Sequence, residues 1–98
     1  MDTRSELVAD MSNYLQEQFP DARVGSSTDG LTANEVFTVN EAGVTRYVEV
    51  TKRWLEGDDA GVPLPRAIRE WGVAREVKAL QPNGTLRVAT TGLERVAS

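Results

Sequence analysis

The sequence predicts one α+β domain spanning residues 1–98, with helices on one face of a mainly antiparallel four-stranded sheet. Three observations lead to this prediction. An apolar stripe with helical spacing opens the chain, short segments with alternating apolar side chains follow, and a second helical stripe precedes the last strand. The predicted element order is therefore α-β-β-β-α-(α or β)-β. Helices and strands that share one apolar core form a two-layer domain.

The first helix is predicted for residues 4–18. Thr3-Arg4-Ser5-Glu6 has the capping-box pattern, in which Ser or Thr is followed three residues later by Glu. Pro20 ends this helix, because the residue before a proline avoids the helical backbone conformation. The apolar stripe consists of residues spaced by three and four positions: Leu7, Val8, Met11, Tyr14, Leu15 and Phe19.

Three strands are predicted next. Residues 21–27 form a weak first strand, with Ala22 and Val24 inward, and residues 35–39 form the second. Residues 40–43 have Asn first and Gly fourth, which is typical of a type I turn and leads into the strand-like run of residues 45–54. A four-residue loop would place Val39 opposite Val44.

This hairpin gives the sheet two different faces, because directly opposed residues share a face. The inward face would carry five apolar side chains: Phe37, Val39, Val44, Val48 and Val50. The outward face would carry one aromatic and one aliphatic side chain among polar ones: Val36, Thr38, Thr45, Tyr47 and Glu49.

The second half of the chain begins with a helix. Its apolar stripe contains Leu64 and Trp71, Pro65 suits its first turn, and Gly72 is placed to end it. Residues 73–80 are compatible with a helix or a strand, and the helix is favoured. Residues 81–84, Gln-Pro-Asn-Gly, indicate a turn before a strand over residues 85–91 that points Arg87 outward. No element is assigned after residue 91.

Composition limits the chemistry. The chain has no Cys and no His, which excludes disulfides, thiolate chemistry, His-based triads and the common zinc sites. No segment resembles a membrane span or a signal peptide, so we expect a cytoplasmic protein that does not bind a membrane. Residues 1–43 carry two cations and eight anions, whereas residues 44–98 carry nine cations and seven anions. The N-terminal half is therefore acidic.

The predicted element order is shared with the core of PD-(D/E)xK nucleases, but the spacing of charged residues argues against that chemistry. A carboxylate and a lysine must lie two positions apart to point into one site, whereas Glu49 and Lys52 are three apart. Glu56, Asp58 and Asp59 also lack the alternate spacing of a calcium loop. We therefore expect a non-catalytic protein without a metal or another cofactor.

Two surfaces are candidates for binding. The first is the outward sheet face, an aromatic anchor with a polar rim that would bind another protein or a second copy as a homodimer: Val36, Thr38, Tyr47, Glu49 and Arg87. A simple solvated face is the alternative interpretation. The second is a basic patch for a nucleic-acid-binding accessory function: Lys52, Arg53, Arg66, Arg69 and Arg75. The sequence pI of about 4.8 opposes strong nucleic-acid binding, so the first surface is favoured.

Overall fold

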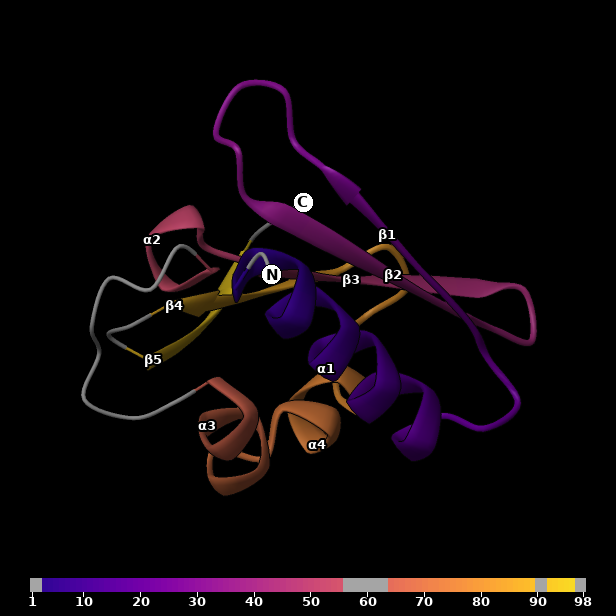
Figure 1. Ribbon diagram of the computed structural model, residues 1–98. Coiled ribbons are helices and arrows are strands. Elements are labelled where there is room, and N and C mark those ends of the chain that lie inside the picture. The colour runs from indigo at the N-terminus through magenta and orange to yellow at the C-terminus, as the bar shows by residue number, and fades with distance from the viewer. Residues whose placement is uncertain (1–2, 56–63, 90–91, 97–98) are drawn as a thin grey trace.

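The computed structural model describes residues 3–55, 64–89 and 92–96 (Figure 1). Its elements follow in the order α1 (Thr3–Gln18), β1 (Arg23–Thr28), β2 (Glu35–Glu41), β3 (Val44–Val50), α2 (Lys52–Leu55), α3 (Leu64–Glu70), α4 (Val73–Lys78), β4 (Thr85–Ala89) and β5 (Gly92–Val96). The predicted α+β class is confirmed, and the first helix has nearly the predicted bounds.

The sheet differs from the prediction in two ways. It has five strands in the order β1-β2-β3-β4-β5, so the expected number of four is wrong. It is also mixed, because β3 and β4 are parallel while the other neighbours are antiparallel. A parallel pair needs a crossover connection, and α2, α3 and α4 lie in the segment that links β3 to β4.

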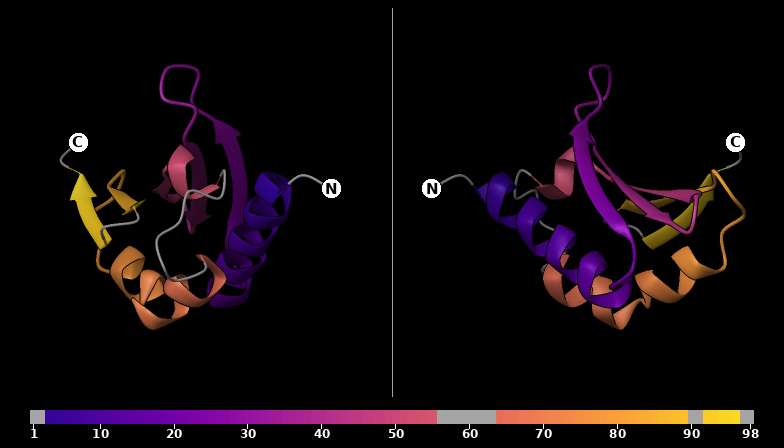
Figure 2. Two further views of the ribbon diagram at one scale, coloured as in Figure 1. Left: turned by 60° about the vertical axis from the view of Figure 1, so that its left-hand side comes forward. Right: turned by 90° about the vertical axis from the view of Figure 1, so that its right-hand side faces the viewer.

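The helices α1, α3 and α4 lie on one side of the sheet (Figure 2). α1 contacts β1 and β2, and α4 contacts β3 and β4. The core between these layers contains Met11 and Leu15 of α1, Phe37 and Val48 of the sheet, and Val77 of α4, all fully buried. Among the described residues, no helix combines the length and the apolar character that crossing a membrane requires.

The β2–β3 hairpin has the predicted faces but a register shifted by two residues. Val39 lies opposite Arg46 rather than Val44, and Glu41 pairs with Val44. The turn therefore contains only Ala42 and Gly43, whose φ values of 54° and 81° are positive as in a type I′ turn. An even shift leaves each side chain on its predicted face, so the division into inward and outward residues is confirmed.

The strand predicted to continue to residue 54 ends at Val50, and α2 follows it. The side-chain Oδ1 of Asn34 accepts the Lys52 main-chain N–H at 2.8 Å and so satisfies a donor in the first turn of α2. Residues 73–78 are helical, as favoured. Gly72 separates α3 from α4 with a left-handed φ of 65°, which confirms the predicted break.

Candidate functional site: the open face of the sheet

The face of the sheet opposite the helices is covered by no described element (Figure 2). One row of side chains crosses this face through four adjacent strands: Thr38, Tyr47, Thr85 and Val96. Tyr47 is near the middle of the row and is partly exposed. The phenol of Tyr47 therefore lies between two threonine residues, with apolar and hydrogen-bonding groups side by side.

A second row lies beside the first and carries the charges of the face. It runs from Val36 through Glu49 and Arg87 to Glu94. Arg87 Nε donates to Glu49 Oε1 at 2.7 Å, and Arg87 Nη1 lies 3.8 Å from Glu94 Oε2. The hydrogen bond to Glu49 raises the pKa of Arg87 above its ordinary value, with the Glu49 charge as a second cause. The guanidinium is therefore charged and satisfied within the face.

The charges of the open face balance. Among the residues of the five strands, those that are charged and point to this side are Arg23, Glu49, Arg87 and Glu94, whose charges sum to zero. Three of the four are joined by the contacts just described. The part of the face that carries Glu49, Arg87 and Glu94 can therefore approach another protein surface with its charges already paired.

The five interface residues predicted from the sequence all lie on this face, but their neighbours differ from expectation. Val36 was expected directly opposite Tyr47, whereas it lies opposite Glu49, and Tyr47 lies opposite Thr38. The two-residue register shift is the reason. Sequence reasoning also missed Thr85, Val96 and Glu94. Thr85 has the same strand parity as Arg87 and could have been found from it, whereas Val96 and Glu94 belong to the unpredicted strand β5.

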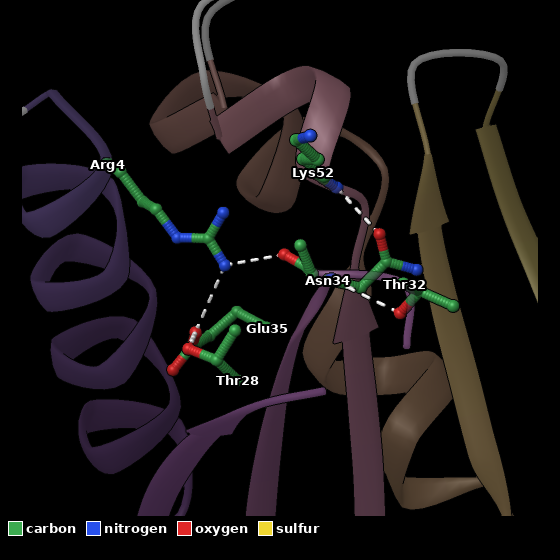
Figure 3. Close-up of polar contacts among 7 residues, drawn as sticks. Arg4, Thr28, Thr32, Asn34, Glu35 and Lys52 are labelled. Atoms are coloured by element: carbon green, nitrogen blue, oxygen red, sulfur yellow. Dashed lines mark hydrogen bonds and ion pairs between the residues drawn. The ribbon is translucent and has the colours of Figure 1, made fainter. Parts of the chain in front are cut away.

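A polar cluster ties the start of α1 to the sheet (Figure 3). Glu35 is only 6% exposed, and its Oε1 accepts hydrogen bonds from Thr28 Oγ1 at 2.8 Å and Arg4 Nη2 at 3.4 Å. Arg4 Nη2 also donates to the Ala33 carbonyl at 2.6 Å. The buried carboxylate is thus neutralised and hydrogen-bonded, which is how proteins accommodate a buried charge.

A hollow of about 430 Å³ lies beside this cluster, between α1 and the end of β1. Its walls are formed by four residues of α1 and two of the sheet: Arg4, Ser5, Val8, Ala9, Thr28 and Glu35. Within the described part of the chain, no three acidic side chains gather to hold a metal ion. The acidic loop of residues 56–59, considered above for calcium, lies outside the described residues.

The cations of the predicted basic patch lie on three helices, α2, α3 and α4. Arg66 pairs with Glu70 at 2.7 Å, and Arg69 lies 3.8 Å from Glu17 near the end of α1. Arg75 follows Gly72 on α4, and the side chain of Arg53 is not described.

Lys52 lies at the other end of α1, beside Asn34 and the Arg4 cluster (Figure 3). Positions 4 and 17 of a helix are about 20 Å apart, at a rise of about 1.5 Å per residue. Lys52 is therefore separated from Arg69 by most of the length of α1. Nucleic-acid binding stays a prediction that this arrangement does not favour.

Comparisons with models of protein families, with curated proteins and with solved structures find no match for this chain.

Proposed function

We propose that the protein is a small non-catalytic interaction module that binds another protein through the open face of its sheet. The observation that carries this proposal is the row around Tyr47, which places an aromatic ring among uncharged side chains on a face that no described helix covers. Tyrosine is enriched at binding hot spots because it supplies apolar area and a hydrogen-bonding hydroxyl together.

The flanking row supports the same function. Glu49, Arg87 and Glu94 satisfy one another, so the partner surface does not need a matching charge at the centre. The surface that fits is an uncharged one with an apolar centre and with hydrogen-bonding groups opposite Thr38 and Thr85. A polar rim around a less polar centre is the usual anatomy of protein interfaces.

The test is affinity capture from nuclease-treated lysate of the native host with three baits: the natural sequence, Val36→Glu and Asn13→Glu. Val36→Glu adds a charge to the open face, whereas Asn13→Glu adds the same charge to the exposed side of α1. The proposal expects a protein that the natural bait and Asn13→Glu capture and that Val36→Glu loses. Far-UV circular dichroism and thermal unfolding establish that all baits are folded.

A second pair of baits tests the anchor. Tyr47→Ala should lose the same protein, while Tyr47→Phe should retain most of it because the ring remains. Unchanged capture by both Val36→Glu and Tyr47→Ala would overturn the proposal. Capture that occurs only in lysate without nuclease treatment would favour the nucleic-acid function instead.

A further inference from the structure

The strand β1 forms an open edge of the sheet. It pairs with β2 on one side, and no described strand pairs with its other side. Its residues are exposed except for the half-buried Val24, and a Cβ added at Gly25 would meet no atom within 4 Å. Proteins commonly protect an edge with lysine, proline, a bulge or a covering segment. The stretch from Gly25 to Thr28 has neither lysine nor proline, and it pairs with β2 in unbroken register.

The opposite edge of the sheet is different. There, β5 carries Glu94 and Arg95 in the middle of the strand. Arg95 Nη2 lies 2.9 Å from Glu76 Oε2 of α4, and Glu94 lies beside Arg87. Charged side chains held in this way discourage the approach of another strand. The two edges are therefore unequal, and β1 is the one available for pairing.

The main-chain groups that β1 exposes can be identified from its pairing with β2. The Asp29 N–H donates to the Asn34 carbonyl at 2.8 Å, in line with the register Thr28↔Glu35. In an antiparallel pair, residues that bond to the neighbour alternate with residues that do not. Arg23, Gly25 and Ser27 therefore bond to β2. The intervening residues Val24, Ser26 and Thr28 direct their N–H and C=O groups away from the sheet.

We infer that β1 pairs antiparallel with β1 of a second copy of this chain, with Ser26 opposite Ser26 across a twofold axis. The sequence of residues 23–29, Arg-Val-Gly-Ser-Ser-Thr-Asp, is complementary to itself in this register. Arg23 of each copy then lies opposite Asp29 of the other, and the residues between them are uncharged. Arg23 makes no ion pair with a described residue of its own chain.

This register also matches the exposed main-chain groups. Val24 of one copy faces Thr28 of the other, and the two Ser26 residues face each other. All three outward residues of each strand are therefore bonded. If one strand were shifted by one residue, the free main-chain groups of one copy would face main-chain groups of the other copy that already bond to β2. Because bonded and free residues alternate along β1, that register is excluded.

The flank of α1 beside β1 permits the approach. An α-helix turns by 100° per residue, so one side of α1 carries four uncharged side chains: Ser5, Ala9, Ser12 and Gln16. Ser5 and Ala9 line the hollow next to Thr28, and Gln16 Nε2 donates to the Ala22 carbonyl at 3.0 Å, so this side faces the edge. These side chains are uncharged, whereas the exposed acids Glu6, Asp10 and Glu17 lie on the opposite flank.

The hollow receives a side chain in this assembly. Because Val24 of the second copy lies opposite Thr28 and on the same face, it points toward the space lined by Val8 and Ala9. Each copy thus supplies an apolar side chain to the hollow of the other. The twofold axis runs perpendicular to the sheet, so both helical layers lie on one side and both open faces form one continuous ten-stranded surface.

Cross-linking of single cysteines tests the register, because the natural chain has no cysteine. In a bonded antiparallel pair the opposed Cα atoms are about 5.5 Å apart, which is within the range of a disulfide. Ser26→Cys is therefore expected to form a covalent dimer under mild oxidation by glutathione disulfide. Ser27→Cys is the matched control, because the two copies of residue 27 would be separated by roughly 8 Å and could not be bridged.

The outcomes are distinct. Rapid dimerisation of Ser26→Cys with slow dimerisation of Ser27→Cys supports the proposed pairing. Equal rates for the two variants would indicate random collision and would overturn it, and so would preferential cross-linking of Ser27→Cys. A natural chain that sediments as a monomer at concentrations up to about 200 μM would also overturn it, whatever the cysteine variants do.

Sedimentation velocity of three further variants separates this edge from other surfaces. Arg23→Glu places two acids opposite each other and should raise the dimer dissociation constant about tenfold or more at low salt. Arg75→Glu changes the net charge equally on α4 and should have no effect. Tyr47→Ala also should have no effect. A dimer lost in Tyr47→Ala but kept in Arg23→Glu would assign self-association to the open face instead.

Discussion

A buried hydroxyl of α1 supports the start of α4, and its removal tests how these two helices are held together. α4 begins after Gly72, which has no side chain to cap the helix. The N–H of Ala74 lies in the first turn, where no partner exists within the helix. The Tyr14 hydroxyl, 60 positions away along the chain, accepts this N–H at 3.0 Å. Both residues are 5% exposed, so water does not readily replace the bond.

Tyr14→Phe removes the acceptor and retains the ring. The change leaves a buried N–H without a partner, and such a loss destabilises proteins by about 1–3 kcal/mol. For a domain of this size, a central value of about 2 kcal/mol corresponds to a decrease in Tm of roughly 8–16 °C. The Ala74 amide should also exchange its hydrogen faster, because α4 opens more readily without the bond.

Urea denaturation followed by far-UV circular dichroism measures the free energy of unfolding. The slope m should stay constant, because the surface exposed on unfolding is unchanged, and the midpoint should fall. Tyr47→Phe is the matched control: it removes the same hydroxyl from the partly exposed face and should change stability by less than about 0.5 kcal/mol. If the two variants are equally stable, the Tyr14 hydroxyl does not support α4 and the reasoning is refuted.

Three further predictions concern the backbone, a buried ion pair and a loop carboxylate. Gly72→Ala should lower the unfolding free energy by about 1–2 kcal/mol, because φ is left-handed there, and the added Cβ would also lie 3.2 Å from Arg75 Nη2. Gly25→Ala, with open space around the new Cβ, should be nearly neutral in the same urea titration. Glu35→Ala should destabilise the domain by about 1.5–3 kcal/mol, since it removes the acceptor of the Thr28 hydroxyl and the carboxylate partner of Arg4; a loss below about 0.5 kcal/mol would contradict this. Hydrogen bonds from the loop main chain lower the pKa of Asp29 below 3.8. The stability that the ionised Asp29 contributes is therefore complete above the pKa of the unfolded chain and is lost as pH falls through the folded pKa. A carboxyl-carbon NMR titration of Asp29 with a midpoint at or above 3.8 would disprove this prediction.

The division of the β2–β3 hairpin into two faces was predictable, whereas its register was not. Apolar alternation identifies a face without fixing the position of the pairing along the strand, because any even shift preserves it. The turn signal from Asn40 and Gly43 favoured a four-residue loop. In the structure Ala42 adopts a positive φ, which is uncommon for a residue with a side chain, and the strands pair further. Local preference was therefore overridden by additional pairing between β2 and β3.

The strand β5 was missed because the sequence has no turn signal before it. Ala89 pairs with Gly92, yet the residues between them in sequence, Thr90 and Thr91, are strand formers rather than turn formers. The short helix α2 was also missed, because Lys52 and Trp54 continue the alternation of the preceding strand in sequence. The signal that starts α2 is the side chain of Asn34, which is remote in sequence and meets Lys52 only after folding.

The candidate interface was predictable where the odd or even position of a residue in its strand decides which face of the sheet it occupies. Parity placed Tyr47, Glu49 and Arg87 on one face, and the structure has them there. The basic patch could not be judged in the same way, since its members come from three helices whose relative positions the sequence does not encode locally. The pairing of Arg69 with Glu17 depends on how α3 lies against α1, which only tertiary packing decides.

The parallel pairing of β3 with β4 has a consequence for synthesis on the ribosome. β3 lacks its second neighbour until β4 has been made, and residues 51–88 separate the end of β3 from the pairing of Val50 with Val88. At about 5–20 residues per second, this segment takes roughly 2–8 s to translate. Until β4 is in place, one side of β3 lacks its partner strand, and Val48 and Val50, which are later fully buried, lack their neighbours Leu86 and Val88. The time for which β3 remains incomplete is therefore set by the length of the crossover between β3 and β4.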